Sequence, residues 1–324
     1  MLYSCSSRPP RVGSVEKGES LQVNHNVLDA IGNTPLIPLA IAGARAGRIW
    51  VKLEFLNPSG SIKDRMALHM ANVAEREGLL QRGGTIVEAT SGNTGISFAM
   101  LAAVRGYRMV AVMPEYMTEE RRALIRSFGA EIVLTPREEG CEGAVRKAEQ
   151  LAAENKGWWL PAQFANRTNV DAHRLTTGRE IIEQTGGEVG AFVAGVGTGG
   201  TLMGVAEALL AHREGVRIVA VEPSECAVMS GGPAAVHNIQ GIGPGFIPSI
   251  VDMSLVSEVV AVPEEEALRM AKRLSREHGL PVGISSGANV LAALQVAEAL
   301  GTGKKVVTVL PDRADRYASL GLLA

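Results

Sequence analysis

The chain has 324 residues, of which 46% are hydrophobic and 20% are charged. These proportions are typical of a globular protein large enough for two domains. The formal net charge of −2 argues against nucleic acid or an anionic membrane as a partner, and no apolar run approaches the roughly 20 residues of a membrane helix. The three cysteines and six histidines are scattered, which predicts no disulfide framework and no metal site, in a reducing compartment.

Residues 1–26 are polar and are expected to form a disordered extension. From about residue 48, short β-rich runs alternate with amphipathic helical runs, which predicts an α/β protein with mostly parallel sheets covered by helices on both faces. The expected strands are 48–54, 85–89, 108–113, 130–134, 191–195, 216–221, 257–261 and 304–310. The expected helices are 62–80, 94–105, 118–128, 138–154, 168–184, 200–213, 263–279 and 287–300.

Lys63 is the first candidate for chemistry. It follows a strand and a Pro/Gly turn, and it begins a predicted helix. In α/β proteins ligands collect at this edge of a sheet, and an amine partly removed from water can form a Schiff base with an aldehyde. Taken alone, the segment favours a solvated lysine in the first turn of a helix.

Two segments rich in small residues follow predicted strands and precede predicted helices. Thr90-Ser91-Gly92-Asn93-Thr94-Gly95 offers hydroxyl and N–H groups at a helix start, which favours a bound carboxylate or phosphate over a simple capping turn. Gly195-Val196-Gly197-Thr198-Gly199-Gly200-Thr201 lets the backbone approach an anion closely. Because it lacks the P-loop lysine and a regular GxGxxG, it predicts a phosphate smaller than a dinucleotide.

A third segment, Val282-Gly283-Ile284-Ser285-Ser286-Gly287-Ala288, is also interpreted as a strand end and a helix start. Its serines are expected either to cap helix 287–300 or to meet a heteroatom of a ligand. An amine able to form an imine, a phosphate cradle and a carboxylate cradle together indicate pyridoxal phosphate acting on an amino acid.

These segments, together with Asn57–Arg65 and His237–Pro248, resemble the signatures of the cysteine synthase (O-acetylserine sulfhydrylase) family. The resemblance covers about nine-tenths of the chain, from Val27 onwards. It implies the tryptophan synthase β-like fold (fold type II of pyridoxal phosphate enzymes), with two three-layer α/β domains. Residues 57–167 are expected to form a smaller, mobile domain, and residues 35–56 and 168–324 a larger domain that binds the cofactor.

The resemblance also implies the roles of single residues. Lys63 is expected to be the Schiff-base lysine and the base that removes the substrate α-proton. The residues expected to bind pyridoxal 5′-phosphate are Lys63, Asn93, Gly197, Thr198, Gly199, Gly200, Thr201 and Ser285. The residues expected to bind the substrate are Thr90, Ser91, Thr94, Gln163 and Gly241.

The implied reaction is replacement of acetate in O-acetyl-L-serine by sulfide, through an aminoacrylate. A serine facing the pyridine nitrogen makes the ring a weaker electron sink than a carboxylate would, which suits β-elimination. The same resemblance implies a cytoplasmic homodimer that is able to take the C-terminal tail of serine acetyltransferase.

Two features depart from the family pattern. Asn166-Arg167-Thr168-Asn169-Val170 lacks the two usual prolines, which leaves the rigidity of the loop beside Gln163 open. Pro311-Asp312-Arg313-Ala314-Asp315-Arg316-Tyr317 resembles the more promiscuous bacterial isoform.

Three alternatives remain open from the sequence. An O-phosphoserine sulfhydrylase needs a cation for the substrate phosphate, and no arginine occurs between Arg217 and Arg269, although Arg121 or Arg122 can still reach the site. A short cystathionine β-synthase uses serine and homocysteine. A non-enzymatic partner or regulator of serine acetyltransferase is disfavoured because Lys63 is present.

Overall fold

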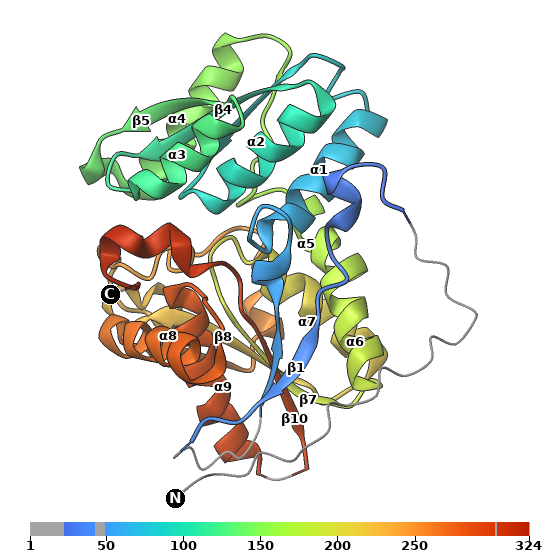
Figure 1. The fold of residues 1–324 in the computed structure, drawn as a ribbon, viewed down its shortest axis with the longest axis vertical. Coiled ribbons are helices and arrows are strands. Elements are labelled where there is room, and N and C mark those ends of the chain that lie inside the picture. The colour runs from blue at the N-terminus through green and yellow to red at the C-terminus, as the bar shows by residue number, and fades with distance from the viewer. Residues whose placement is uncertain (1–22, 43–48, 302, 324) are drawn as a thin grey trace, which may run out of the picture.

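The computed structural model describes residues 23–42, 49–301 and 303–323. Two α/β units lie one above the other in Figure 1, each built around its own sheet. Most of the expected N-terminal extension lies outside the described residues. Within them, Asn26 caps a 3-10 turn by accepting a hydrogen bond from the N–H of Leu28 at 2.9 Å.

The larger sheet has six strands in the order β1-β2-β10-β7-β8-β9. All neighbours are parallel except β1, which runs antiparallel to β2. The strands are β1 (Leu36–Leu39), β2 (Ile49–Lys52), β7 (Val189–Gly195), β8 (Arg217–Pro223), β9 (Glu258–Val262) and β10 (Lys305–Val309). The helices around it are α5 (Thr168–His173), α6 (Arg179–Thr185), α7 (Gly200–His212), α8 (Glu264–His278) and α9 (Ile284–Leu300).

The smaller sheet is fully parallel, with the order β5-β4-β3-β6. Its strands are β3 (Thr85–Ala89), β4 (Arg108–Pro114), β5 (Glu131–Thr135) and β6 (Trp158–Trp159), and its helices are α1 (Lys63–Arg76), α2 (Asn93–Arg105), α3 (Glu119–Ser127) and α4 (Gly140–Glu154). All of these elements fall within residues 57–167, the segment that we propose as the smaller domain.

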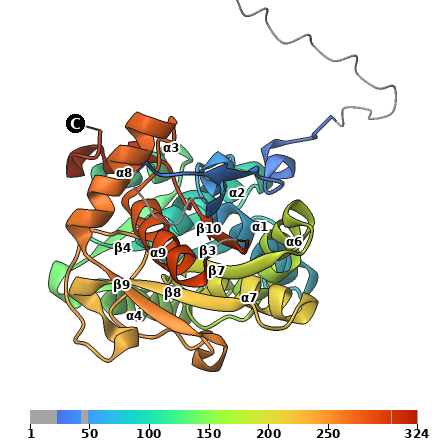
Figure 2. The ribbon, with the colours of Figure 1, turned by 90° about the horizontal axis from the view of Figure 1, so that it is seen from below.

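Each sheet is buried on both faces, as parallel sheets require. Along β7, Ala191 and Val193 pack on the side of α8 and α9, while Phe192 and Ala194 pack on the side of α7. Figure 2 shows α8 and α9 gathered on one side of β8 and β9. The predicted fold class is therefore confirmed.

Two expected elements differ in detail. The single helix expected over 168–184 is a short α5, a π-helical turn at Arg174–Gly178, and α6. The helix expected at 287–300 begins earlier, at Ile284, with Gly283 as its N-cap. Ser285 and Ser286 thus lie inside the first turn, so the expectation that one of them caps the helix was wrong.

Among the described residues, no helix is both long enough and apolar enough to cross a membrane.

Candidate active site

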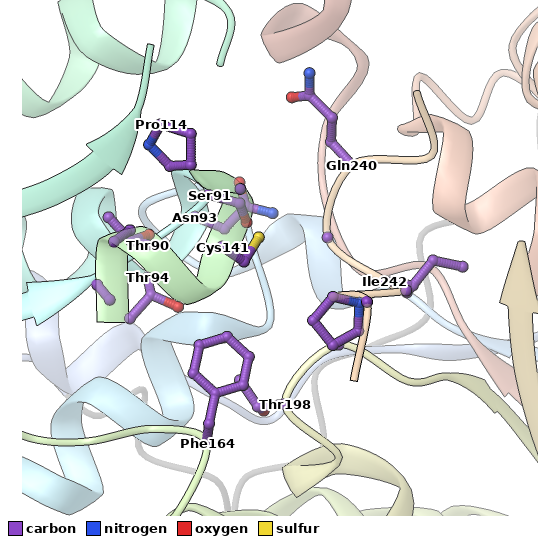
Figure 3. A pocket seen from close by; sticks show the side chains of 18 of the residues that line it. Thr90, Ser91, Asn93, Thr94, Pro114, Cys141, Phe164, Thr198, Gln240 and Ile242 are labelled. Carbon is purple, nitrogen blue, oxygen red and sulfur yellow. The ribbon is translucent and has the colours of Figure 1, made fainter. Parts of the chain in front are cut away.

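A cavity of about 350 Å³ lies where strands of both sheets end. Its lining includes the last residues of four strands: Ala89 of β3, Pro114 of β4, Gly195 of β7 and Val309 of β10. Figure 3 shows Thr90 and Thr94 on one side of it and Gln240 and Ile242 on the other. The carboxyl edge of parallel strands is where such folds bind ligands.

The structure brings nearly all of the predicted site residues to this one cavity. Those that line it are Lys63, Thr90, Ser91, Asn93, Thr94, Gln163, Gly197, Thr198, Gly199, Thr201, Gly241 and Ser285. Gly200 is the exception: it is buried at the first residue of α7, directly behind the lining residues.

Lys63 is the first residue of α1 and follows a turn that is held in place by the larger sheet. The N–H of Ile62 donates to the carbonyl oxygen of Pro311 at 2.9 Å, just beyond the end of β10. Burial lowers the pKa of the Lys63 amine, because the ammonium form loses hydration, and the carboxylate of Asp312 opposes this shift. An amine with a lowered pKa is more often neutral, as a nucleophile or a base must be.

Asp312 is the charged neighbour of Lys63, and it was not among the predicted site residues. Its side chain is buried, and its Oδ2 accepts from Asn93 Nδ2 at 2.6 Å and from the Tyr317 hydroxyl at 2.7 Å. Arg121 Nη2 lies 3.8 Å from the same oxygen. Four charged residues shortly after the last strand, in the segment Pro311–Tyr317, were the available signal in the sequence.

Asn93 is held from both sides of its amide. Arg316 donates to Oδ1, while Nδ2 donates to Asp312. Because a guanidinium can only donate and a carboxylate can only accept, the amide has a single favourable orientation. The second Nδ2 hydrogen remains available to an acceptor in the cavity.

The segment Gly197–Thr201 forms an anion cradle at the N-terminus of α7. A Cβ at Gly197 would overlap the carbonyl oxygen of Gly241, and Gly199 has a φ of +88°, so both positions require glycine. The free N–H groups and the positive end of the dipole of a 13-residue helix point to a negative ligand here.

His173 supports this cradle from behind. It is buried, with Nε2 at 3.3 Å from Thr201 Oγ1 and Nδ1 at 2.9 Å from Thr177 Oγ1. Burial lowers its pKa well below the usual value, and the positive charge of Arg65 adds to this shift. The imidazole is therefore neutral and serves as a hydrogen-bonding support.

The opposite end of the cavity is made of hydroxyl and amide groups. Thr90 Oγ1 accepts from the N–H groups of Gly92 at 2.8 Å and Gly95 at 3.0 Å, which fixes the entry to α2. Thr94 Oγ1 donates to Gln163 Oε1 at 2.7 Å, and Gln163 Nε2 donates to the carbonyl oxygen of Ala89 at 2.6 Å. These neutral groups suit a carboxylate, which accepts several hydrogen bonds at once.

The loop beside Gln163 is held by side-chain hydrogen bonds in place of prolines. Asn166 Nδ2 donates to the carbonyl oxygen of Pro161 at 3.0 Å, and Asn166 Oδ1 accepts from the N–H of Thr168 at 3.0 Å. Asn169 Nδ2 donates to the carbonyl oxygen of Gln163 at 2.9 Å. The loop therefore has a defined conformation without either proline.

Taken together, these groups fit pyridoxal phosphate. The Gly197–Thr201 cradle accepts a phosphate, the Lys63 amine accepts an aldehyde, and Asn93 offers an N–H to a ring oxygen. Ser285, in the first turn of α9, is a buried neutral hydroxyl that also lines the cavity. The fold and this set of donors define a pyridoxal phosphate enzyme.

Comparison with known proteins supports the same class of enzyme. Residues 27–312 match the family described as "Pyridoxal-phosphate dependent enzyme", and the chain belongs to this family. It is 47% identical over 299 residues to the cysteine synthase of Staphylococcus aureus, covering 92% of this chain and 96% of the relative.

Solved structures give the same result. The fold is similar to that of an O-ureido-L-serine synthase, with a TM-score of 0.89 and 43% identity over 93% of this chain and 96% of the other. It is also similar to the cysteine synthase (OASS) of Entamoeba histolytica, with a TM-score of 0.89 and 40% identity over 97% and 94% of the two chains. The family resemblance predicted from the motifs is thus confirmed, as is the cofactor.

Proposed function

We propose that this chain is a cysteine synthase, which replaces the acetate of O-acetyl-L-serine by sulfide to form L-cysteine. One observation carries the proposal: a single cavity holds the Lys63 amine, the Gly197–Thr201 cradle and the hydroxyl groups of Thr90 and Thr94. This arrangement supports a cofactor phosphate and a substrate carboxylate that bind beside the same amine. The similarity to cysteine synthases supports this choice of reaction.

Lys63 provides the base. When bound, pyridoxal phosphate withdraws electrons from the substrate and so acidifies its α-carbon. The neutral Lys63 amine removes the proton at that carbon, and the burial that lowers its pKa keeps the amine ready to do so. Asp312 then stabilises the ammonium that results, since it is the carboxylate that faces Lys63.

The substrate carboxylate is assigned to Thr90, Ser91, Thr94 and Gln163. Thr94 and Gln163 are hydrogen-bonded to each other, so an incoming carboxylate has to replace that bond. We propose that this exchange moves the smaller domain over the cavity and excludes water from the reacting atoms.

The lining favours acetate over phosphate as the leaving group. Among the described residues that line the cavity, Lys63 is the one lysine and none is an arginine. Arg121 donates to Gln240 and lies over the Tyr317 ring, while Arg122 donates to the carbonyl oxygen of Glu115. Neither residue is among those that line the cavity, which supports an uncharged acetyl group as the leaving group.

Initial rates with O-acetylserine, O-phosphoserine and serine, each at several concentrations, test the proposal. The first two are assayed with sulfide, and serine with both sulfide and homocysteine. We expect kcat/KM for O-acetylserine to exceed the other values by more than tenfold, as loss of a matched leaving group costs at least that much. Preference for O-phosphoserine, or for serine with homocysteine, would overturn the assignment.

We also propose that the enzyme is a cytoplasmic homodimer whose cavity accepts the C-terminal tail of serine acetyltransferase. The family resemblance supports both points. The mass in solution, measured by light scattering, tests the dimer, and competition between a synthetic acetyltransferase tail peptide and O-acetylserine tests the second point.

A further inference from the structure

Asn169 connects the two ends of the cavity with one side chain. It lies in the first turn of α5 and is fully buried. Its Nδ2 donates to the carbonyl oxygen of Gln163 at 2.9 Å and to Thr198 Oγ1 at 2.9 Å. Gln163 belongs to the proposed carboxylate end, and Thr198 belongs to the phosphate cradle.

The orientation of the Asn169 amide follows from its partners. The Gln163 carbonyl can only accept, so the NH₂ group rather than Oδ1 has to face it. Oδ1 then points towards Gly200, where a Cβ would overlap it, and it has no hydrogen-bond partner in the described structure. Both hydrogens of the amide are therefore used, one at each end of the cavity.

This orientation also fixes the polarity of the Thr198 hydroxyl. Thr198 Oγ1 accepts from Asn169 Nδ2 and, at 3.4 Å, from the N–H of Gly200. A hydroxyl has two acceptor sites and one proton, so with its acceptor sites engaged its proton is free to be donated. Because Thr198 lines the cavity, that donor is available to a bound anion.

At the other end, Asn169 restrains the backbone that presents Gln163. The preceding residue, Ala162, has a φ of +53°, a conformation that residues with a side chain adopt only when their surroundings impose it. The hydrogen bond from Asn169 to the Gln163 carbonyl is part of those surroundings. The Gln163 side chain is thereby held where it meets Thr94.

We propose that Asn169 is a positioning residue that aims the Thr198 hydroxyl at the cofactor phosphate and holds Gln163 for the substrate carboxylate. The proposal rests on the assignment of those two residues made above. It predicts that one substitution at Asn169 weakens the binding of both the cofactor and the substrate, although Asn169 itself is assigned to contact neither.

The test uses Asn169→Ala, Thr198→Val and the double variant. The dissociation constant of pyridoxal phosphate for the apoprotein and the KM for O-acetylserine of the holoenzyme are measured for each. We expect Asn169→Ala to weaken cofactor binding by about tenfold to hundredfold, the scale of a hydrogen bond to a charged group. In the Thr198→Val background the same change should cost less than threefold in cofactor affinity, yet still raise the KM.

Asn166→Ala is the matched control, since Asn166 holds the same loop through Pro161 and Thr168. It should leave the cofactor dissociation constant within about twofold of the unmodified value. Asn169→Asp keeps the shape of the side chain but removes the donors, and it is measured as well in case the alanine variant fails to fold. Asn169→Asp should weaken the binding of pyridoxal phosphate and of O-acetylserine at least as much as Asn169→Ala does.

Additive losses of cofactor affinity in Asn169→Ala and Thr198→Val would overturn the proposal, as would equal effects of Asn166→Ala and Asn169→Ala. An unchanged cofactor affinity in Thr198→Val would overturn both the Thr198 assignment and this inference. Cysteine synthesis by the unmodified chain would be unaffected by that result, so failure here is distinguishable from failure of the proposed function.

Discussion

The two ends of the cavity present hydrogen-bond donors by different means. At Gly197–Thr201 the donors are mainly backbone N–H groups, packed so closely that Gly197 has no room for a side chain. At Thr90–Thr94 the donors are side chains already bonded within the protein, as in the Thr94 to Gln163 hydrogen bond. The first end is complete before a ligand arrives, whereas the second has to exchange partners when one binds.

This difference matches the ligands that we assign to each end. A cofactor that stays bound through many turnovers gains from a preorganised cradle, because little has to be ordered on binding. A substrate that arrives and leaves in every turnover suits groups that change partners. Variants at the two ends should therefore separate cofactor affinity from substrate KM.

The largest effect is expected between the two ends, at Lys63. Lys63→Ala should lower kcat for cysteine formation by about a thousandfold or more, because it removes the base. The cradle at Gly197–Thr201 remains, so the variant should still bind pyridoxal phosphate, without the covalent attachment. Retained turnover with O-acetylserine would show that another group is the base.

At the cofactor end, Gly197→Ala should weaken pyridoxal phosphate binding by at least about tenfold. The new Cβ would overlap the Gly241 carbonyl oxygen, so either the cradle or the Gly241 loop has to shift. Titration of the apoprotein, followed by fluorescence, measures the change. An unchanged dissociation constant would mean that the cradle is not preorganised as described.

At the substrate end, Gln163→Ala should raise the KM for O-acetylserine by about tenfold, the scale of a hydrogen bond to a charged group. The cofactor dissociation constant should not change, because truncation leaves the Gln163 carbonyl that Asn169 contacts. Gln150→Ala, at an exposed glutamine of α4, is the control and should change neither quantity. If the KM stays constant, Gln163 does not hold the substrate.

A separate prediction concerns stability. Glu88 is buried near the substrate end of the cavity, and burial raises its pKa to about 8. Hydrogen bonds from the backbone N–H groups of Gln163, Ala89 and Ala162 oppose this rise but are outweighed by burial. Between about pH 4.5 and 8 the folded chain keeps this proton while the unfolded chain loses it. Stability should therefore fall as pH rises through that range, by up to about 1.4 kcal/mol per pH unit from this group.

Glu88→Gln removes this titration. Urea unfolding of the apoprotein at pH 5.5 and 7.5 should show a smaller loss of stability in the variant than in the unmodified chain. Equal losses in the two proteins would mean that Glu88 titrates alike in the folded and unfolded states.

The sequence predicted the strands of both sheets except β1 and β6. β1 is a short edge strand containing Pro38, and β6 has only two residues, so neither carries a clear alternation. The interruption of helix 168–184 by a π-helical turn was not predicted either. These features depend on packing between segments distant in the chain.

Most of the residues that line the cavity and that we assign to ligands were predictable, because they lie in short motifs of the sequence. Asp312, Arg316 and Asn169 were not predicted, because they act through contacts across the fold. Asp312 and Arg316 bond to Asn93 over separations of 219 and 223 residues. No local pattern reveals such contacts, and only the folded chain brings them together.

The most direct test of the account is to mix the holoenzyme with O-acetylserine in the absence of sulfide and measure released acetate. If Lys63 drives elimination before sulfide enters, about one acetate per active site should appear rapidly, together with a change in the visible absorbance that sulfide reverses. Lys63→Ala should release none. Acetate that appears only after sulfide is added, or equally in Lys63→Ala, would contradict the proposed order of events and the role of Lys63.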